Sequence, residues 1–204
     1  MARRRSRRSW CRCDGGLHRR ACLQQSGLEC VGHPSAQLRR RAGAAGEPVG
    51  RAGRGYANFL RILDEGRIAI AALSVGAAQG CVDESVKYAG GEREAFGRKI
   101  GTNQAIAFKI ARMETRAHVA RAAYYDAAAL MLSGKPFKKQ AAIAKLVASE
   151  AAMDNARDAT QIFGGYGFMN EYSVARHYRD SKILEIGEGT TEVQLMLIGR
   201  ELGL

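Results

Sequence analysis

From about residue 57 to the end of the chain, apolar residues recur at the three- and four-residue steps of an α-helix. The first such segment is 57–88, and one stripe of it holds Leu60, Leu63, Arg67 and Ile70. Gly90-Gly91 follows, and paired glycines commonly end a helix. These residues predict one long amphipathic helix.

A second helix is expected after a loop at 91–102. Its apolar positions alternate steps of four and three for more than three heptads, which is the pattern of a helix packed along its whole length. The members of this seam are Ile106, Ile110, Met113, Ala117, Ala120, Tyr124, Ala127 and Met131. Small residues near its centre predict close approach to a neighbouring helix.

Two more helices follow the stop signal at 133–136. The third spans about 137–163 and carries Leu146, Met153, Ala156 and Phe163 on one side. A glycine-rich break at 164–167, a short irregular or helical stretch at 172–182 and a second break at 187–189 separate it from a last helix at 190–202, which packs through Val193 and Leu197.

This pattern predicts an all-α fold, an antiparallel four-helix bundle over residues 55–204. Neither a strand pair nor a βαβ unit is visible in it. No run of about 18 apolar residues occurs, so no membrane-spanning helix is expected.

Residues 1–54 differ in character. With residue 55 they hold 13 Arg, no Lys and three acids, so +10 of the chain's formal +12 belongs to this tail. It lacks helical or strand periodicity and large aliphatic residues, which predicts a disordered or non-native segment. Three explanations stay open: out-of-frame translation, a genuine disordered tail, and a targeting or nucleic-acid-binding arm. Only a transit peptide would change the expected location from the cytoplasm to the mitochondrial matrix.

The tail also holds most of the cysteines, together with two histidines: Cys11, Cys13, Cys22, Cys30, His18 and His33. Their spacing matches no common zinc-ligand pattern, so no metal site is expected. Cys81, in an Ala- and Gly-rich helix, is predicted to be a small core residue.

Chemistry is expected where the helices are interrupted or charged. Four such places stand out: Asp64-Glu65-Gly66-Arg67, Arg93-x-x-Phe96-Gly97 with Gln104, Gln161-Ile162-Phe163-Gly164-Gly165, and Glu188-Gly189-Thr190-Thr191. Glycines allow a backbone to approach a ligand closely, and a carboxylate at 188 precedes a helix. Each motif alone is weak.

Taken together, in this order and spacing, these motifs resemble the C-terminal helical domain of the acyl-CoA dehydrogenase family, over residues 55–204. The resemblance implies FAD-dependent α,β-dehydrogenation of an acyl-CoA thioester, with Glu188 as the base that removes the α-proton. Other members carry the base on the first helix, at the position of Gly66 here, which has no side chain to serve.

The resemblance also implies a role for each remaining motif. Acyl-CoA contacts fall on Asp64, Glu65, Gly66, Arg67 and Gly189. FAD contacts fall on Arg93, Phe96, Gln104, Gln161, Ile162, Phe163, Gly164, Gly165, Thr190, Thr191 and Glu192. A homodimer or homotetramer is implied because family members contact the FAD of a neighbouring subunit, and an electron-transfer flavoprotein is the implied electron acceptor.

Simpler roles remain open at three positions. Glu188 could be an acid that stabilises the start of a helix, Arg67 could form a surface salt bridge with Asp64 or Glu65, and Arg93 could be a solvated loop charge. Gly187 stands where many family members place Tyr, which predicts a reshaped acyl pocket. The whole chain could also be a non-catalytic helical dimerisation module or a truncated gene product without flavin.

Overall fold

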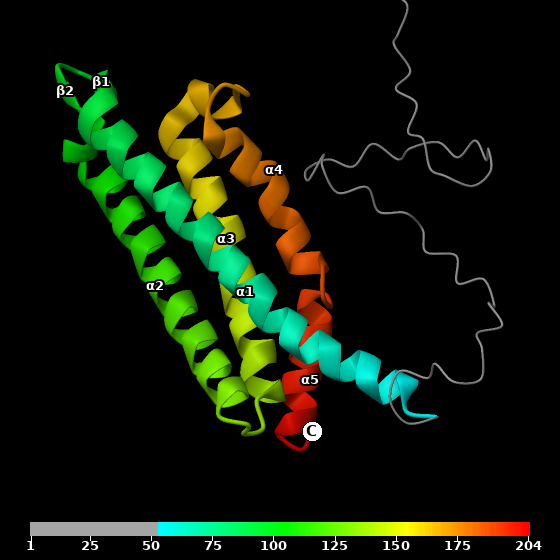
Figure 1. The fold of residues 1–204 in the computed structure, drawn as a ribbon. Coiled ribbons are helices and arrows are strands. Elements are labelled where there is room, and N and C mark those ends of the chain that lie inside the picture. The colour runs from blue at the N-terminus through cyan, green and yellow to red at the C-terminus, as the bar shows by residue number, and fades with distance from the viewer. Residues whose placement is uncertain (1–52) are drawn as a thin grey trace, which may run out of the picture.

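The computed structural model describes residues 53–204, so nearly all of the predicted tail, with its cysteines and histidines, lies outside the described residues. Three long helices run up, down and up: α1 (Gly55–Lys87), α2 (Gln104–Leu132) and α3 (Lys138–Phe163). Two shorter helices, α4 (Ser173–Ile186) and α5 (Thr191–Glu201), then follow one another down the side of α3 (Figure 1). Together they form the fourth arm of the bundle, and the predicted all-α four-helix architecture is confirmed.

The fold differs from the expectation in two local elements. The stretch expected to be short and irregular or helical is a full helix of 14 residues, α4. A small hairpin, which was not predicted, pairs β1 (Glu94–Ala95) with β2 (Arg98–Lys99) in antiparallel register. Three short helical turns complete the chain: a π-helical turn η1 (Tyr88–Glu92) and the 3-10 turns η2 (Ile100–Thr102) and η3 (Gly164–Phe168).

The heptad seam of α2 is confirmed as its packed face. Met113, Ala117, Ala120 and Ala127 are fully buried, and the other seam residues pack against the core from its edge. The stripe expected on α1 is wrong at Leu60, which is exposed. The buried line of α1 begins near Arg67 because the start of this helix projects beyond the other helices (Figure 1).

Alanine dominates the core and lets the helices approach one another closely. Most core positions of α3 are alanines, and this helix contacts α1, α2, α4 and α5. Cys81 is buried as predicted, and burial raises the pKa of its thiol to about 12. Van der Waals contact between closely packed small side chains therefore adds to the hydrophobic stabilisation of this bundle.

One buried amide connects three of the helices. The Asn155 Nδ2 of α3 donates to the carbonyl of Ala78 on α1 (3.2 Å) and to that of Met113 on α2 (2.9 Å). Its Oδ1 accepts a hydrogen bond from Arg116 (3.1 Å). Burying an amide is unfavourable unless its polar atoms are satisfied, as they are here.

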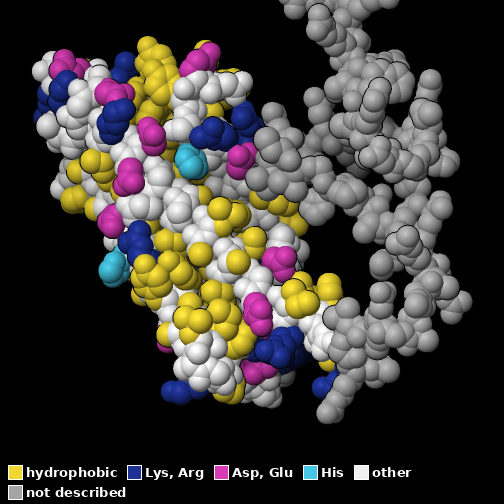
Figure 2. Space-filling model, viewed as in Figure 1, with side chains coloured by type: hydrophobic (Ala, Val, Ile, Leu, Met, Phe, Trp, Pro, Cys, Tyr) yellow, Lys and Arg dark blue, Asp and Glu magenta, His cyan; other side chains and the backbone are white. Residues whose placement is uncertain are grey.

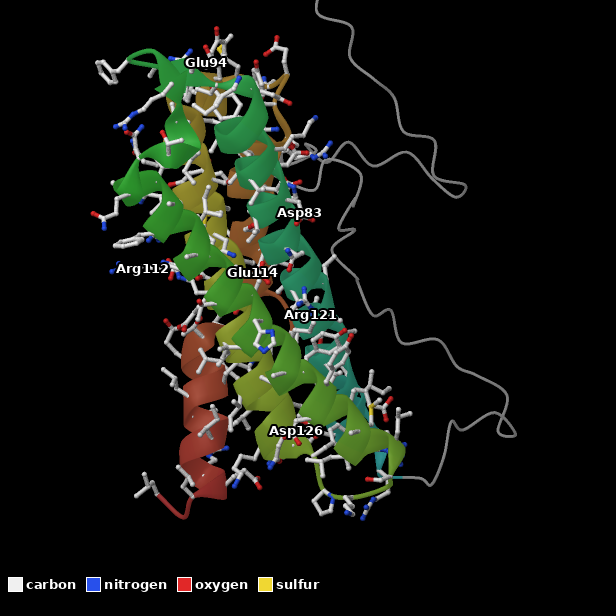
Figure 3. All side chains as sticks on the ribbon, turned by 90° about the vertical axis from the view of Figure 1, so that its left-hand side faces the viewer. Asp83, Glu94, Arg112, Glu114, Arg121 and Asp126 are labelled. Carbon is white, nitrogen blue, oxygen red and sulfur yellow. The ribbon has the colours of Figure 1, made fainter. Side chains whose placement is uncertain are left out.

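Charged side chains cover the outer face that α1 and α2 share (Figure 3). Gln79 of α1 donates to Asp83 (3.0 Å) and Glu114 (3.2 Å) and accepts from Arg121 of α2 (2.6 Å). On the face of the molecule shown in Figure 2, apolar side chains form patches between the charged ones. Within residues 53–204, no helix has the length and apolarity needed to cross a membrane.

Candidate active site

Glu188 lies in the four-residue turn 187–190 that joins α4 to α5. Its backbone has φ +54°, a left-handed conformation that non-glycine residues seldom adopt, and Gly189 follows with φ +98°. The Glu188 side chain is half-buried and reaches across to α1. The turn thus directs a carboxylate toward the first helix.

Glu188 meets α1 at Gly66. A Cβ atom placed on Gly66 would lie only 2.8 Å from Glu188 Oε2, so the carboxylate occupies the space a side chain at 66 would need. The sequence excluded residue 66 as the base because glycine has no side chain. The structure brings positions 66 and 188 together, so that a side chain from only one of them can occupy the space between α1 and the turn.

Two buried polar side chains lie beneath this turn, and neither was predicted from the sequence. Lys145 of α3 is fully buried, and its ammonium donates to the carbonyls of Glu185 (2.9 Å) and Gly189 (2.7 Å). Gln194 of α5 is also fully buried, and its amide donates to the carbonyls of Glu188 (3.2 Å) and Gly189 (2.8 Å). The backbone on both sides of the Glu188 Cα is therefore held from inside the bundle.

Burial lowers the pKa of the Lys145 ammonium; the negative charges of Glu185, Glu188 and Glu192 oppose that shift, and the positive charge of Arg67 adds to it. A signal for this lysine exists in the sequence. Lys145 lies within a run of apolar residues spaced by four and three: Ala141, Ala148 and Ala152. A lysine in such a stripe is either an interruption of the core or a buried functional cation.

Asp64 and Arg67 form an ion pair on α1. The sequence left open whether Arg67 contacts acyl-CoA or forms a surface salt bridge. The pair with Asp64 exists, but the Arg67 side chain is only 6% exposed, so it is not a surface bridge. The Arg67 Nε is buried and has no hydrogen-bond partner among the described residues, which leaves a donor available near Gly66. Glu65 instead faces solvent, 3.7 Å from Arg61.

The remaining predicted site residues, apart from those at the start of α5, gather at the other end of α4. An aromatic cluster joins the segment after α1 to the end of α3: the rings of Tyr88 and Phe163 stack with centroids 3.9 Å apart. The Arg93 guanidinium lies over the ring of Tyr166, 5.9 Å from its centroid. The Arg93 loop and the glycine-rich segment 161–165 are therefore neighbours, as their shared assignment to FAD requires.

Phe96 forms the tip of the hairpin between β1 and β2, at the end of the bundle where Figure 3 labels Glu94. Phe96 and Gly97 are its two turn residues, and both have positive φ (+54° and +76°), as a type I′ hairpin turn requires. Asn is the usual first residue of such a turn, whereas here a phenyl ring stands 99% exposed. The ring therefore offers an apolar surface that is open to contact from outside the described residues.

Within the segment 161–165, buried and open positions differ. Ile162 and Phe163 point into the core, so a ligand could meet them only through their backbone. Gln161 is exposed, and no described atom lies within 4 Å of a Cβ placed on Gly164 or Gly165. Gln161 and Gly164 also line a surface pocket of about 310 Å³ with Arg157, Thr160 and Tyr178.

The two groups of predicted residues are separated along the bundle by α4. Fourteen helical residues span about 21 Å. Thr190, Thr191 and Glu192 lie with Glu188 at the start of α5, where hydrogen bonds from the Thr190 hydroxyl and from its own backbone N–H lower the pKa of Glu192. Arg93, Phe96, Gln104 and 161–165 lie at the other end.

Known proteins resemble this chain over the whole helical bundle. Residues 53–203 match the family model for the acyl-CoA dehydrogenase C-terminal domain. The chain belongs to the acyl-CoA dehydrogenase family. The match covers all but one of the described residues, so the helical bundle as a whole, and not only its motifs, is characteristic of the family.

Individual members of the family are similar at the level of sequence and of structure. The probable acyl-CoA dehydrogenase YngJ of Bacillus subtilis is 47% identical over 86% of this chain and 43% of its own length. The caffeyl-CoA reductase-Etf complex subunit CarC of Acetobacterium woodii is 45% identical over 74% and 39%. The structure of butyryl-CoA dehydrogenase from Megasphaera elsdenii superimposes with a TM-score of 0.74 at 46% identity, over 76% of this chain and 40% of that one. The chain thus spans about two fifths of the length of these acyl-CoA dehydrogenase relatives.

Proposed function

We propose that this chain supplies the catalytic carboxylate, Glu188, for α,β-dehydrogenation of an acyl-CoA thioester. The observation that carries the proposal is the placement of Glu188, which is left-handed in its backbone and seated in the space left free by Gly66. A helix-start acid would not need such a conformation, because an acidic side chain stabilises a helix terminus from an ordinary backbone geometry.

The main group that this chain must supply for the proposed dehydrogenation is one well-placed general base. Glu188 accepts the proton α to the thioester carbonyl, and the electron pair of that C–H bond forms the new carbon–carbon double bond as hydride leaves the β-carbon. A positioned general base contributes about 10²–10⁴-fold to such a step. Asp64 and Arg67, beside Gly66, are the proposed acyl-CoA contacts, with Glu65 and Gly189 at the edges of the same region.

Family members are FAD-dependent flavoproteins, and FAD, when bound, accepts the hydride from the β-carbon. The residues of this chain fit such a ligand in two respects. Arg93, Gln104 and Gln161 are exposed donors at one end of the bundle, and the open backbone at Gly164 and Gly165 allows close approach of a phosphate group. Phe96 offers an aromatic face beside them. These residues are the proposed FAD contacts.

A homodimer or homotetramer is part of the proposal. Thr190, Thr191 and Glu192 lie beside Glu188, whereas the Arg93 and Gln161 groups lie about 21 Å away along α4. Two copies of the chain would allow the distant group of one to complete the flavin site beside Glu188 of the other. An electron-transfer flavoprotein is the proposed acceptor of the electrons, supported by the Etf complex named for the relative CarC.

The test begins with FAD binding. The chain is incubated with FAD, freed of unbound cofactor and examined for visible flavin absorbance, and a short-chain acyl-CoA is then added without oxygen. We expect the absorbance to bleach in the native chain. Glu188→Gln should retain the flavin and lose about 10²–10⁴-fold in the bleaching rate, because an amide cannot accept the proton.

Glu171→Gln is the matched control, since Glu171 is an exposed carboxylate in the turn before α4 with no assigned role. Equal bleaching rates in native chain and Glu188→Gln would refute the role of Glu188. A colourless chain that dimerises without taking up FAD would favour the alternative of a helical association module.

A further inference from the structure

Lys145 is the largest side chain that the bundle buries completely. Lysine is almost never fully buried unless it is paired, because removing an ammonium from water is strongly unfavourable. Here the partners are two backbone carbonyls, at 2.9 Å and 2.7 Å, and no carboxylate is recorded in an ion pair with it among residues 53–204. An alanine at this position would continue the apolar stripe of α3, so the cation needs an explanation.

The acceptors of Lys145 flank Glu188 on both sides. Glu185 is in the last turn of α4, and Gly189 directly follows Glu188. Gln194 adds bonds to the carbonyls of Glu188 and Gly189, so the Gly189 carbonyl receives one donor from α3 and one from α5. All four hydrogen bonds are accepted by backbone carbonyls of residues 185–189, the segment whose conformation sets the position of the Glu188 Cα.

We propose that Lys145, assisted by Gln194, is a positioning residue that holds the 185–189 backbone and thereby aims the Glu188 carboxylate at Gly66. Its meaning for catalysis rests on the proposed function of Glu188. Left-handed backbone at a non-glycine residue is unfavourable, and the Lys145 and Gln194 donors hold the backbone beside Glu188 in this conformation.

A purely structural role for Lys145 would be to cap α4, because cations stabilise helix C-termini. The bond to the Glu185 carbonyl fits that role. The shorter bond to Gly189 does not, since Gly189 lies beyond the end of α4 and before the start of α5. The lysine therefore joins three segments at the turn rather than ending one helix.

Backbone hydrogen exchange of the full chain, measured by mass spectrometry without flavin or substrate, tests this role. Lys145→Met keeps the length of the side chain and removes its donors. We expect the amides of residues 186–191 to exchange about tenfold faster or more, while amides of the α2 seam change little. Lys109→Met is the control, because it deletes a lysine that joins α2 to Asp158 of α3 (3.0 Å) and leaves the turn untouched.

Acceleration confined to 186–191 in Lys145→Met, and absent in Lys109→Met, supports the proposal. Acceleration of the same size in α2 and in the turn would overturn it, since that pattern reports general loss of stability. Should Lys145→Met fail to fold, Gln194→Leu provides the same comparison, because it removes the other two donors and introduces no charge. Local acceleration is again required of it.

The flavin-bleaching assay adds a functional measurement. Lys145→Met should lower the limiting rate of bleaching about tenfold or more while the acyl-CoA concentration for half-maximal rate changes little. An unchanged limiting rate despite a loosened turn would overturn the positioning role. If Glu188→Gln itself bleaches normally, the proposed function fails, and the exchange experiment still shows whether Lys145 holds the turn.

Discussion

Two turns of this molecule share an unusual backbone and differ in what supports it. Phe96-Gly97 and Glu188-Gly189 each pair a non-glycine residue at φ +54° with a glycine of positive φ, and these two are the non-glycine residues with positive φ within 53–204. The Glu188 turn is bound from below by Lys145 and Gln194. The Phe96 turn closes a hairpin of two-residue strands at the surface, and its ring lies in solvent.

This difference separates two ways of presenting a functional side chain. The Glu188 turn is coupled to the core through α3 and α5, so its geometry is determined before any ligand arrives, as a general base requires. The Phe96 turn is a local structure, and its exposed side chain is available to contact another surface. We infer that the first region is preorganised for chemistry and that the second serves binding.

The largest expected difference comes from the glycines of the two turns. Gly189→Ala should lower the free energy of unfolding by about 2–4 kcal/mol, because φ is +98° and the new Cβ would lie 2.8 Å from Gln194 Nε2. Gly97→Ala should lower it by about 1 kcal/mol, since φ is +76° and no described atom lies within 4 Å. Urea unfolding measures both, and equal losses would contradict the comparison.

Substitution of Gly66 should change the free energy of unfolding less than substitution of Gly189 does, but it should displace the Glu188 carboxylate. Gly66→Ala puts a methyl group against Glu188 Oε2, whereas Gly76→Ala, in the same helix, meets no described atom within 4 Å. Alanine favours a helix over glycine by up to about 1 kcal/mol, so neither variant should be strongly destabilised. Only Gly66→Ala should slow flavin bleaching, by about 10²-fold; equal rates in the two variants would show that the 66–188 contact is unimportant.

The smallest effect is expected at the hairpin. Phe96→Asn places the preferred residue at the first position of a type I′ turn and should raise the free energy of unfolding by about 0.5 kcal/mol. It should also weaken FAD binding, because the exposed ring is lost. A variant that is less stable, or that binds FAD as the native chain does, would show that the ring is not retained for binding.

The sequence predicted the bundle because its strongest signals are local and periodic. The seam from Ile106 to Met131 gave α2 its buried face, and the glycine pairs gave the ends of α1 and α3. By contrast, α4 was only partly recognised, since two of its four buried positions are the small residues Ala175 and Ser181. Such side chains contrast weakly with their polar neighbours, so periodicity cannot mark them.

Motifs in the sequence pointed to the candidate site, but not to the side chains that hold its backbone. Glu188 and Gly66 were singled out from separate motifs, and only the folded chain reveals that they touch. Lys145 donates to backbone carbonyls 40 and 44 residues away in sequence, and Gln194 donates to carbonyls in the turn before its own helix. A carbonyl has no sequence signature. The β1–β2 hairpin was missed because two residues per strand are too few to show alternation.

Asn155 touches neither Glu188 nor Gly66, yet it bears on both. Its amide can bond to the Ala78 and Met113 carbonyls at the same time only when α1, α2 and α3 have one particular alignment along their axes. A slip of α1 by a single residue would rotate Gly66 about 100° away from its present direction and turn another side chain toward the carboxylate. The alignment of helices along their lengths is thus set in the middle of the molecule, and the spacing between two points 122 residues apart in sequence depends on it.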